Sequence, residues 1–308
     1  MVARTPTRRY AHFAQFMAVL LIALPVQAEI RMRDALEREV VLPGPAQRVV
    51  SLAPHITEVV YAAGAGEQLV GAVAYSNYPP EALDVTRVGA YDSISLETIV
   101  SLQPDLVLAW RSGNGEEIVR RIESLGINVY VSETRTLEDV AYSLRNVGRL
   151  TGNEALAEQA ATEFLQELAR LRDTYSYETP VSVFYQVWHE PLLTLNGEHL
   201  VSDVVRLCGG VNAFKESPAL VSRINVESVI GADPDVIVAS GMDKARPEWL
   251  DEWRRWSSIR AVEHEQLYFV PPDLLQRHTP RIIEGAGQLC AHLATARRYY
   301  RQEAAKGQ

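Results

Sequence analysis

The chain has 308 residues and a formal net charge of −9 at neutral pH, with a pI near 5.4. This acidic balance argues against nucleic acid as a partner, because phosphate backbones attract basic surfaces. The length is at the size where single hydrophobic cores stop growing, so two domains are the default expectation.

The first 28 residues have the features of a secretory signal peptide. Arg4, Arg8 and Arg9 precede an apolar stretch, residues 16–24, and Val26-Gln27-Ala28 offers small residues for cleavage near Ala28. The apolar stretch is too short for a membrane span, which needs about 20 residues. We therefore expect a mature, periplasmic protein with a net charge near −12. The predicted cleavage point has no cysteine, so a lipid anchor is not expected.

Short β-branched segments alternate with helical patterns after the leader. The expected strands are residues 48–52, 106–110 and 128–131, and the expected helices are residues 56–63, 116–125 and 137–150. This alternation is typical of βαβ units with parallel strands.

One long amphipathic helix follows. From Asn153 to Tyr175 apolar residues recur every three or four positions, without Gly or Pro between them. Beyond Pro180 the βαβ pattern resumes with residues 181–187, 201–207, 236–239 and 267–270. We predict an α/β protein with two Rossmann-like lobes, residues 29–152 and 177–308, joined by a bridging helix, residues 153–176, with a ligand cleft between the lobes.

The two lobes share an internal repeat. Residues 94–109 align with residues 224–239 without a gap, and residues 57–64 align with residues 202–209 in the same order. Each lobe is therefore predicted to be one copy of the same fold, related to the other by a pseudo-two-fold axis.

Two cysteines are present, Cys208 and Cys290. In an oxidising compartment an even pair predicts one disulfide, although two buried free thiols are the alternative. Closing a loop of about 80 residues would contribute a few kcal/mol, mainly by restricting the unfolded chain.

Aromatic residues collect at the carboxyl ends of the predicted strands, where α/β proteins bind ligands. They are Tyr75, Tyr78, Tyr91, Trp110 and Trp188. Each ring could instead cap the core of its own lobe. Together they favour a large, flat, partly apolar ligand, because rings bury much area at low entropic cost.

Glu97 and Glu227 are matched glutamates of the repeat, each two residues after a predicted N-cap, Ser95 or Asn225. A carboxylate in a first helical turn is modestly stabilising by itself. A matched pair of carboxylates could also meet two basic sites on a two-fold symmetric transporter.

These segments resemble the periplasmic cobalamin-binding proteins of vitamin B12 ABC importers, over about residues 48–292. The residues that carry the resemblance are Tyr75-Ser-Asn-Tyr-Pro-Pro80, Ile94-Ser-Leu-Glu-Thr-Ile-Val100, residues 104–114, Leu207-Cys-Gly-Gly210, Asn212-Ala-Phe-Lys215 and Thr279-Pro-Arg-Ile-Ile283. The resemblance implies lobes that close only slightly around the ligand.

The resemblance also assigns roles to individual residues. It implies that Tyr75 and Trp110 contact a corrin, that the loop Asp273-Leu274-Leu275-Gln276-Arg277 contacts the ligand, that Glu97 and Glu227 dock on the permease, and that Cys208 pairs with Cys290. The chain would then be a monomer without catalytic activity, metal or cofactor, and the corrinoid would be its transported ligand.

This chain departs from the family in its cleft. Tyr91, Val187, Val221 and Leu274 stand where the family has aromatic residues, and Trp188 is one place from the expected ring. A related corrinoid, haem or a ferric siderophore therefore remains an alternative ligand, with Tyr75, His55 or His278 as candidate axial ligands for haem iron.

An exported hydrolase is the remote alternative. The sequence contains no Gly-x-Ser-x-Gly, His-Glu-x-x-His, Ser-x-x-Lys or Gly-x-x-x-x-Gly-Lys motif. His189-Glu190 lacks the second histidine that a zinc site of this type requires.

Overall fold

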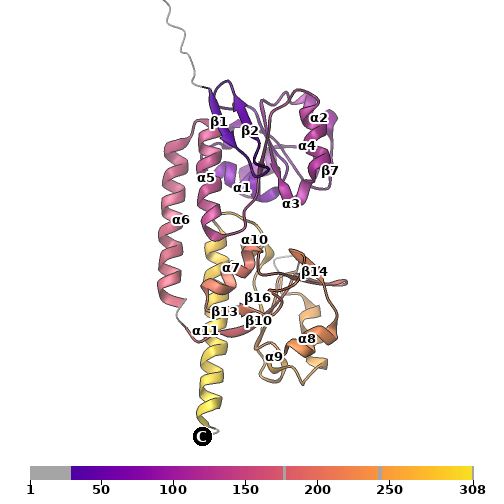
Figure 1. The fold of residues 1–308 in the computed structure, drawn as a ribbon, viewed down its shortest axis with the longest axis vertical. Helices are drawn as coiled ribbons and strands as arrows, with labels where there is room; N and C mark the ends of the chain where they lie inside the picture. Colours follow the sequence, from indigo (N-terminus) through magenta and orange to yellow (C-terminus); the bar gives the residue numbers. More distant parts are fainter. Residues whose placement is uncertain (1–28, 176–177, 242–244, 307–308) are drawn as a thin grey trace, which may run out of the picture.

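The computed structural model describes residues 29–175, 178–241 and 245–306, so the predicted signal peptide lies outside the described residues. The described chain forms two α/β lobes, one above the other in Figure 1, and helix α6 (Glu154–Tyr175) runs from one lobe to the other along one side. The predicted fold class is confirmed. In the described part of the chain no helix combines the length and apolar character that a membrane crossing requires.

The N-terminal lobe is built on a parallel sheet in the order β5-β4-β3-β8-β9. The strands are β3 (Val49–Ser51), β4 (Leu69–Ala72), β5 (Thr86–Arg87), β8 (Leu106–Trp110) and β9 (Val129–Ser132). The helices are α1 (Pro54–Ala62), α2 (Leu96–Ser101), α3 (Arg111–Asn114), α4 (Glu116–Glu123) and α5 (Leu137–Thr151), with 3-10 turns at Gly66–Gln68 and Pro80–Asp84. Two small hairpins are added, β1 (Ile30–Arg33) with β2 (Glu39–Leu42) and β6 (Gly89–Ala90) with β7 (Ser93–Ile94). Helices on both faces explain why the central strands are almost uniformly apolar.

The C-terminal lobe is built on a parallel sheet in the order β13-β10-β15-β16. Its strands are β10 (Val181–Gln186), β13 (Gly210–Asn212), β15 (Val236–Ala239) and β16 (Leu267–Phe269), and an antiparallel sheet adds β11 (Trp188–His189), β12 (Leu192–Leu195) and β14 (Val221–Arg223). Its helices are α7 (Leu200–Leu207), α8 (Val226–Ala232), α9 (Arg260–Glu263), α10 (Pro272–Leu275) and α11 (Ile282–Lys306), with a 3-10 helix at Glu248–Arg255.

The two sheets have the same topology, which confirms the predicted repeat. The order β4-β3-β8-β9 in one lobe corresponds to β13-β10-β15-β16 in the other. The repeat extends to backbone detail, because α2 and α8 are each followed by a non-glycine residue in the left-handed region, Gln103 with φ 47° and Asp233 with φ 41°.

One hydrophobic cluster is common to both lobes, and each lobe adds a smaller cluster of its own. The largest buried cluster includes residues from both sheets together with the inner face of α6. Phe164 and Leu168 of α6 belong to it, together with Leu144 of α5 and Val204 of α7. A continuous core through the bridging helix favours lobes that move little against each other.

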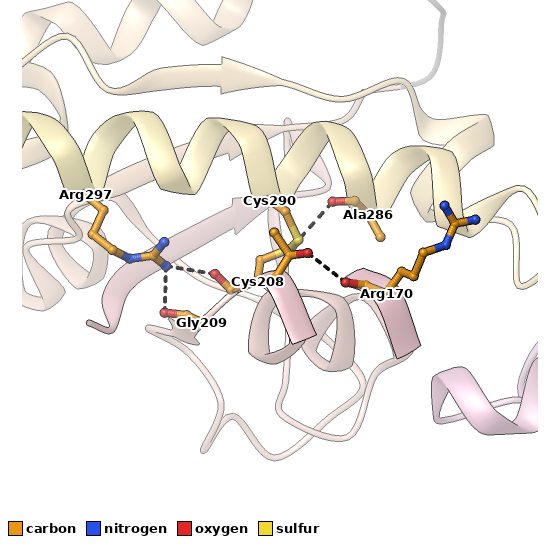
Figure 2. The surroundings of a disulfide bond; sticks show 7 residues. Arg170, Cys208, Gly209, Ala286, Cys290 and Arg297 are labelled. Atoms are coloured by element: carbon orange, nitrogen blue, oxygen red, sulfur yellow. Dashed lines mark hydrogen bonds between the residues drawn. A yellow bond between two sulfur atoms is a disulfide. The ribbon is translucent and has the colours of Figure 1, made fainter. Parts of the chain in front are cut away.

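The predicted disulfide is confirmed, because Cys208 after α7 is bonded to Cys290 of α11. Figure 2 shows Arg297 of α11 donating to the carbonyl oxygens of Cys208 and Gly209, at 2.8 and 3.1 Å. The bond and these hydrogen bonds fix the end of α7 on α11.

Removing the disulfide is expected to lower the free energy of unfolding by about 2–4 kcal/mol, because the bond closes a long loop in the unfolded chain. The sequence separation of its ends is 82 residues. Chemical unfolding of a Cys208→Ala, Cys290→Ala variant against the oxidised protein measures the loss. A reduced wild-type sample that unfolds at the same denaturant concentration as the oxidised one would contradict this expectation.

Candidate interlobe binding site

A cavity of about 340 Å³ lies between the lobes. The N-terminal lobe lines it with residues that follow β8 and β9, and the C-terminal lobe lines it with the start of α7, the segment leading into β14, and His278. A second cavity of about 390 Å³ adjoins it and shares Glu133, Thr134 and His278 as lining residues. The cavities thus lie at the carboxyl ends of the parallel strands, where the sequence predicts the ligand.

Trp110 lies among histidines in this cleft. Its ring is 5.0 Å from the ring of His55 and 6.3 Å from that of His278, centroid to centroid, and His278 is 5.4 Å from His199. The indole Nε1 of Trp110 and the Nδ1 of His278 are buried and have no hydrogen-bond partner in the described chain. A ligand in the cleft could therefore accept a hydrogen bond from the indole N–H of Trp110 and form one, as donor or acceptor, with Nδ1 of His278.

The three imidazoles are held neutral at ordinary pH. Burial, reinforced by the charge of Arg135, lowers the pKa of His278 to about 4. Burial also holds the pKa of His55 well below its usual range, and lowers the pKa of His199 to about 3. No three His, Cys, Asp or Glu side chains among the described residues are arranged to hold a metal ion.

A fixed carboxylate forms one wall of the cleft. Glu133 accepts hydrogen bonds from the backbone and hydroxyl of Ser112, each at 3.0 Å, and from Nε of Arg135 at 2.8 Å. Three donors on one carboxylate keep α3 and the loop after β9 in place.

Arg277 of the predicted ligand loop bridges the lobes. Its guanidinium donates to Glu58 of α1 at 2.7 Å, to the side chain of Asn77 at 2.8 Å and to the carbonyl of Tyr75 at 3.2 Å, and it pairs with Asp273 at 2.9 Å. Arg281 donates twice to the same Glu58 carboxylate, at 2.9 and 2.7 Å. Glu58 is therefore a buried anion that receives two cations from the opposite lobe.

The second copy of the repeat makes a corresponding contact with the N-terminal lobe. Asp203 of α7, which aligns with Glu58 in the repeat, accepts a hydrogen bond from the backbone N–H of Leu137 at 2.8 Å. Leu137 is the first residue of α5 in the N-terminal lobe. Each lobe thus sends one carboxylate from the same position of the repeat to the other lobe.

The loop that carries Tyr75 and Tyr78 contacts Arg277 and Arg281 of the C-terminal lobe, and neither tyrosine lines the interlobe cavity. Tyr75 is 76% exposed and has φ 64°, a strained value for a tyrosine. Tyr78 is 41% exposed, and its ring lies 3.8 Å from the Arg281 guanidinium, a cation–π contact. Both tyrosines thus lie beside the arginines of the opposite lobe.

The other predicted site residues differ in their exposure and in their contacts. Tyr91 is 48% exposed. The side-chain amide of Asn114 donates a hydrogen bond to the carbonyl oxygen of Tyr91 and accepts one from the backbone N–H of Trp110. Trp188 lies in β11, where it contacts the ring of His189. Gln276 is partly exposed, whereas Leu274 is 8% and Leu275 is 0% exposed. The side chain of Leu275 packs in the shared core.

Glu97 and Glu227 occupy equivalent exposed positions in the first turns of α2 and α8. The predicted caps are confirmed, because Ser95 and Asn225 accept the backbone N–H of Thr98 and Ser228. Neither helix needs its glutamate as a cap.

Four residues at the interface between the lobes are not among the site residues that the sequence predicts. Glu58 and Arg281 form the interlobe ion pairs, and Glu133 and His199 line the cavity. The internal repeat aligns Glu58 with Asp203, and this match in the sequence could have indicated that Glu58 has a role.

Two lobes of the same fold, a bridging helix and a cavity between them define the class of two-lobed solute-binding proteins. Comparison with known proteins identifies the family. Residues 49–274 match the family described as "Periplasmic binding protein", and the chain belongs to this family.

The chain is similar to curated vitamin B12-binding proteins. It is 37% identical over 257 residues to that of Vibrio cholerae serotype O1, covering 83% of this chain and 92% of the relative. It is 36% identical over 249 residues to that of Pectobacterium carotovorum, covering 80% and 88%.

Solved structures show the same fold. The crystal structure of the periplasmic vitamin B12 binding protein BtuF of Vibrio cholerae superposes with a TM-score of 0.76 at 37% identity, covering 82% of this chain and 98% of that one. The periplasmic heme-binding protein RhuT from Roseiflexus sp. RS-1 superposes with a TM-score of 0.71 at 23% identity, covering 82% and 99%. The second likeness concerns the fold alone.

Proposed function

We propose that this protein captures cobalamin or a related corrinoid in the cleft between its lobes and delivers it to an ABC permease in the inner membrane. The observation that carries the proposal is the 37% identity to a vitamin B12-binding protein over most of both chains. The interlobe cavity, with an indole and unpaired buried polar atoms, supports it. The protein would act in the periplasm as a monomeric transport component without catalytic activity.

An equilibrium titration tests the ligand. The purified protein is titrated with cyanocobalamin, cobinamide, haemin and ferrichrome, and saturable one-to-one binding of a corrinoid is expected. A tight haemin complex with a shifted Soret band, together with no corrinoid binding, would reverse the assignment in favour of haem.

The proposed ligand contacts combine rings with polar groups. Tyr75, Tyr78, Tyr91, Trp110 and Trp188 would cover the apolar faces of the macrocycle, and Asp273, Gln276 and Arg277 would hydrogen-bond its side-chain amides. Few polar groups among apolar ones is the usual composition of small-molecule sites. For Leu274 and Leu275, the burial of both side chains favours a supporting role beneath the loop.

Replacing Trp110 with alanine is expected to weaken corrinoid binding by roughly 1–3 kcal/mol, because the ring would lose its packing on the macrocycle. Trp256, which packs on Trp253 in the C-terminal lobe, provides the matched control. Both variants are titrated with cyanocobalamin. An unchanged dissociation constant for Trp110→Ala would remove the indole from the site.

Glu97 and Glu227 are proposed to dock on the permease, since exposed carboxylates at matched positions suit a partner with two-fold symmetry. The double variant Glu97→Ala, Glu227→Ala is expected to keep its affinity for cyanocobalamin and to bind the reconstituted vitamin B12 importer more weakly. Equal loss of both functions would contradict the separation of the two surfaces.

A further inference from the structure

The matched helices α2 and α8 expose more than their glutamates. Val100 is 47% exposed and Ile230 is 37% exposed, and the two residues align in the repeat. Each lies three residues after the glutamate of its helix, so that carboxylate and aliphatic side chain are neighbours on one helix face.

The exposure of these two residues is not explained by the core. A single exposed aliphatic residue on a protein surface is ordinary. Here the buried positions of the two copies coincide, with Ile99 and Val229 facing the core in each. The exposed position beside them has stayed aliphatic in both copies, although it contributes little to either core.

The two copies lie on a common side of the molecule. Figure 1 shows α2 in the upper lobe and α8 in the lower lobe, both away from the bridging helix α6. One partner could therefore contact both helices without touching the helical side of the protein.

We propose that Val100 with Glu97, and Ile230 with Glu227, form two equivalent contact points for a two-fold symmetric permease, each fitting an apolar recess beside a basic side chain. This inference rests on the proposed function and deepens it. The carboxylates set orientation and speed of encounter, which depend on salt. The aliphatic residues bury apolar surface and slow dissociation, an effect that does not depend on charge.

The test compares two double variants on the vitamin B12 importer held in lipid nanodiscs. Val100→Ser with Ile230→Ser is expected to raise the dissociation constant roughly fivefold per residue and roughly 25-fold together, since distant sites are additive. The salt dependence of binding should stay as in the unmodified protein. Glu97→Ala with Glu227→Ala should instead reduce the salt dependence.

The matched control removes exposed aliphatic residues elsewhere. Leu156 of α6 is 54% exposed and Val211 of β13 is 39% exposed, one on the bridging helix and one in the C-terminal sheet. Leu156→Ser with Val211→Ser should bind the importer as the unmodified protein does. All variants are first shown to bind cyanocobalamin equally, which confirms that they are folded.

The outcomes separate the two proposals. If the serine variant binds the importer within twofold of the control, the paired contact is overturned. Loss of salt dependence in the glutamate variant reports on the proposed docking function alone, whatever the serine variant does.

Discussion

Replacing Glu58 with alanine is expected to lower the free energy of unfolding by about 3–5 kcal/mol, the range for removing one partner of a buried ion pair. The Glu58 side chain is 2% exposed, and those of Arg277 and Arg281 are 12% and 21% exposed. Without the carboxylate, the guanidinium groups stay largely buried and lose their strongest hydrogen bonds. Urea unfolding followed by circular dichroism measures the loss.

The control is a solvent-exposed ion pair between the same two residue types, glutamate and arginine. Glu158 of α6 receives two hydrogen bonds from Arg145 of α5, and their side chains are 56% and 40% exposed. Glu158→Ala should leave the unfolding midpoint almost unchanged, because solvent screens such pairs. If Glu58→Ala cost no more than Glu158→Ala, the buried network would contribute nothing beyond a surface pair.

The position of Glu58 in the repeat gives its contact a structural meaning. Glu58 and Asp203 are matched, and each contacts the opposite lobe, one through arginine side chains and the other through a helix N-terminus. Two reciprocal contacts, together with the core that continues through α6, restrain the lobes from both sides. We infer that the cleft is largely formed before ligand binds.

The sequence predicts the repeated parts of this fold well. The strand at Leu106–Trp110 has the predicted bounds, because a buried parallel strand is an uninterrupted apolar run. Ser95 and Asn225 were recognisable as caps because capping depends on residues close in sequence. The disulfide was predictable because the chain has only two cysteines.

The ion pairs between the lobes could not be predicted from the sequence. The partner of Glu58 is 219 residues away, and nothing in the apolar helix around Glu58 indicates a cation. The sequence pattern does not predict helix α11 either. Its Gly285 lowers helix propensity, and the structure explains this residue, since a Cβ there would lie 2.3 Å from the carbonyl oxygen of Leu274.

The predicted ligand loop presents its five side chains to different surroundings. Five consecutive residues, 273–277, were assigned to the ligand, but Pro272–Leu275 forms a helical turn. A turn of helix directs successive side chains to different sides. Asp273 and Arg277 pair with each other, whereas Leu275 packs in the core.

The cleft histidines should make the protein less stable in acid. An unfolded imidazole has a pKa near 6.5, whereas burial lowers the pKa of His278 to about 4 and holds that of His55 well below its usual range. Because the folded values are depressed, the unfolded chain binds more protons than the folded chain between about pH 6.5 and pH 4. Stability is therefore full above this window and falls as the pH falls through it.

His278 alone should account for about 3 kcal/mol of this loss, since one pKa unit corresponds to about 1.4 kcal/mol. Urea unfolding across this pH range measures it, and His278→Asn provides the comparison. The carboxylates titrate alike in both proteins, so the difference between the two pH profiles isolates the imidazole. We expect the variant to have a lower free energy of unfolding at neutral pH. Its free energy of unfolding should then fall less than that of the unmodified protein as the pH is lowered. Parallel profiles would mean that His278 takes up no proton on unfolding, and its burial in the cleft would then carry no electrostatic cost.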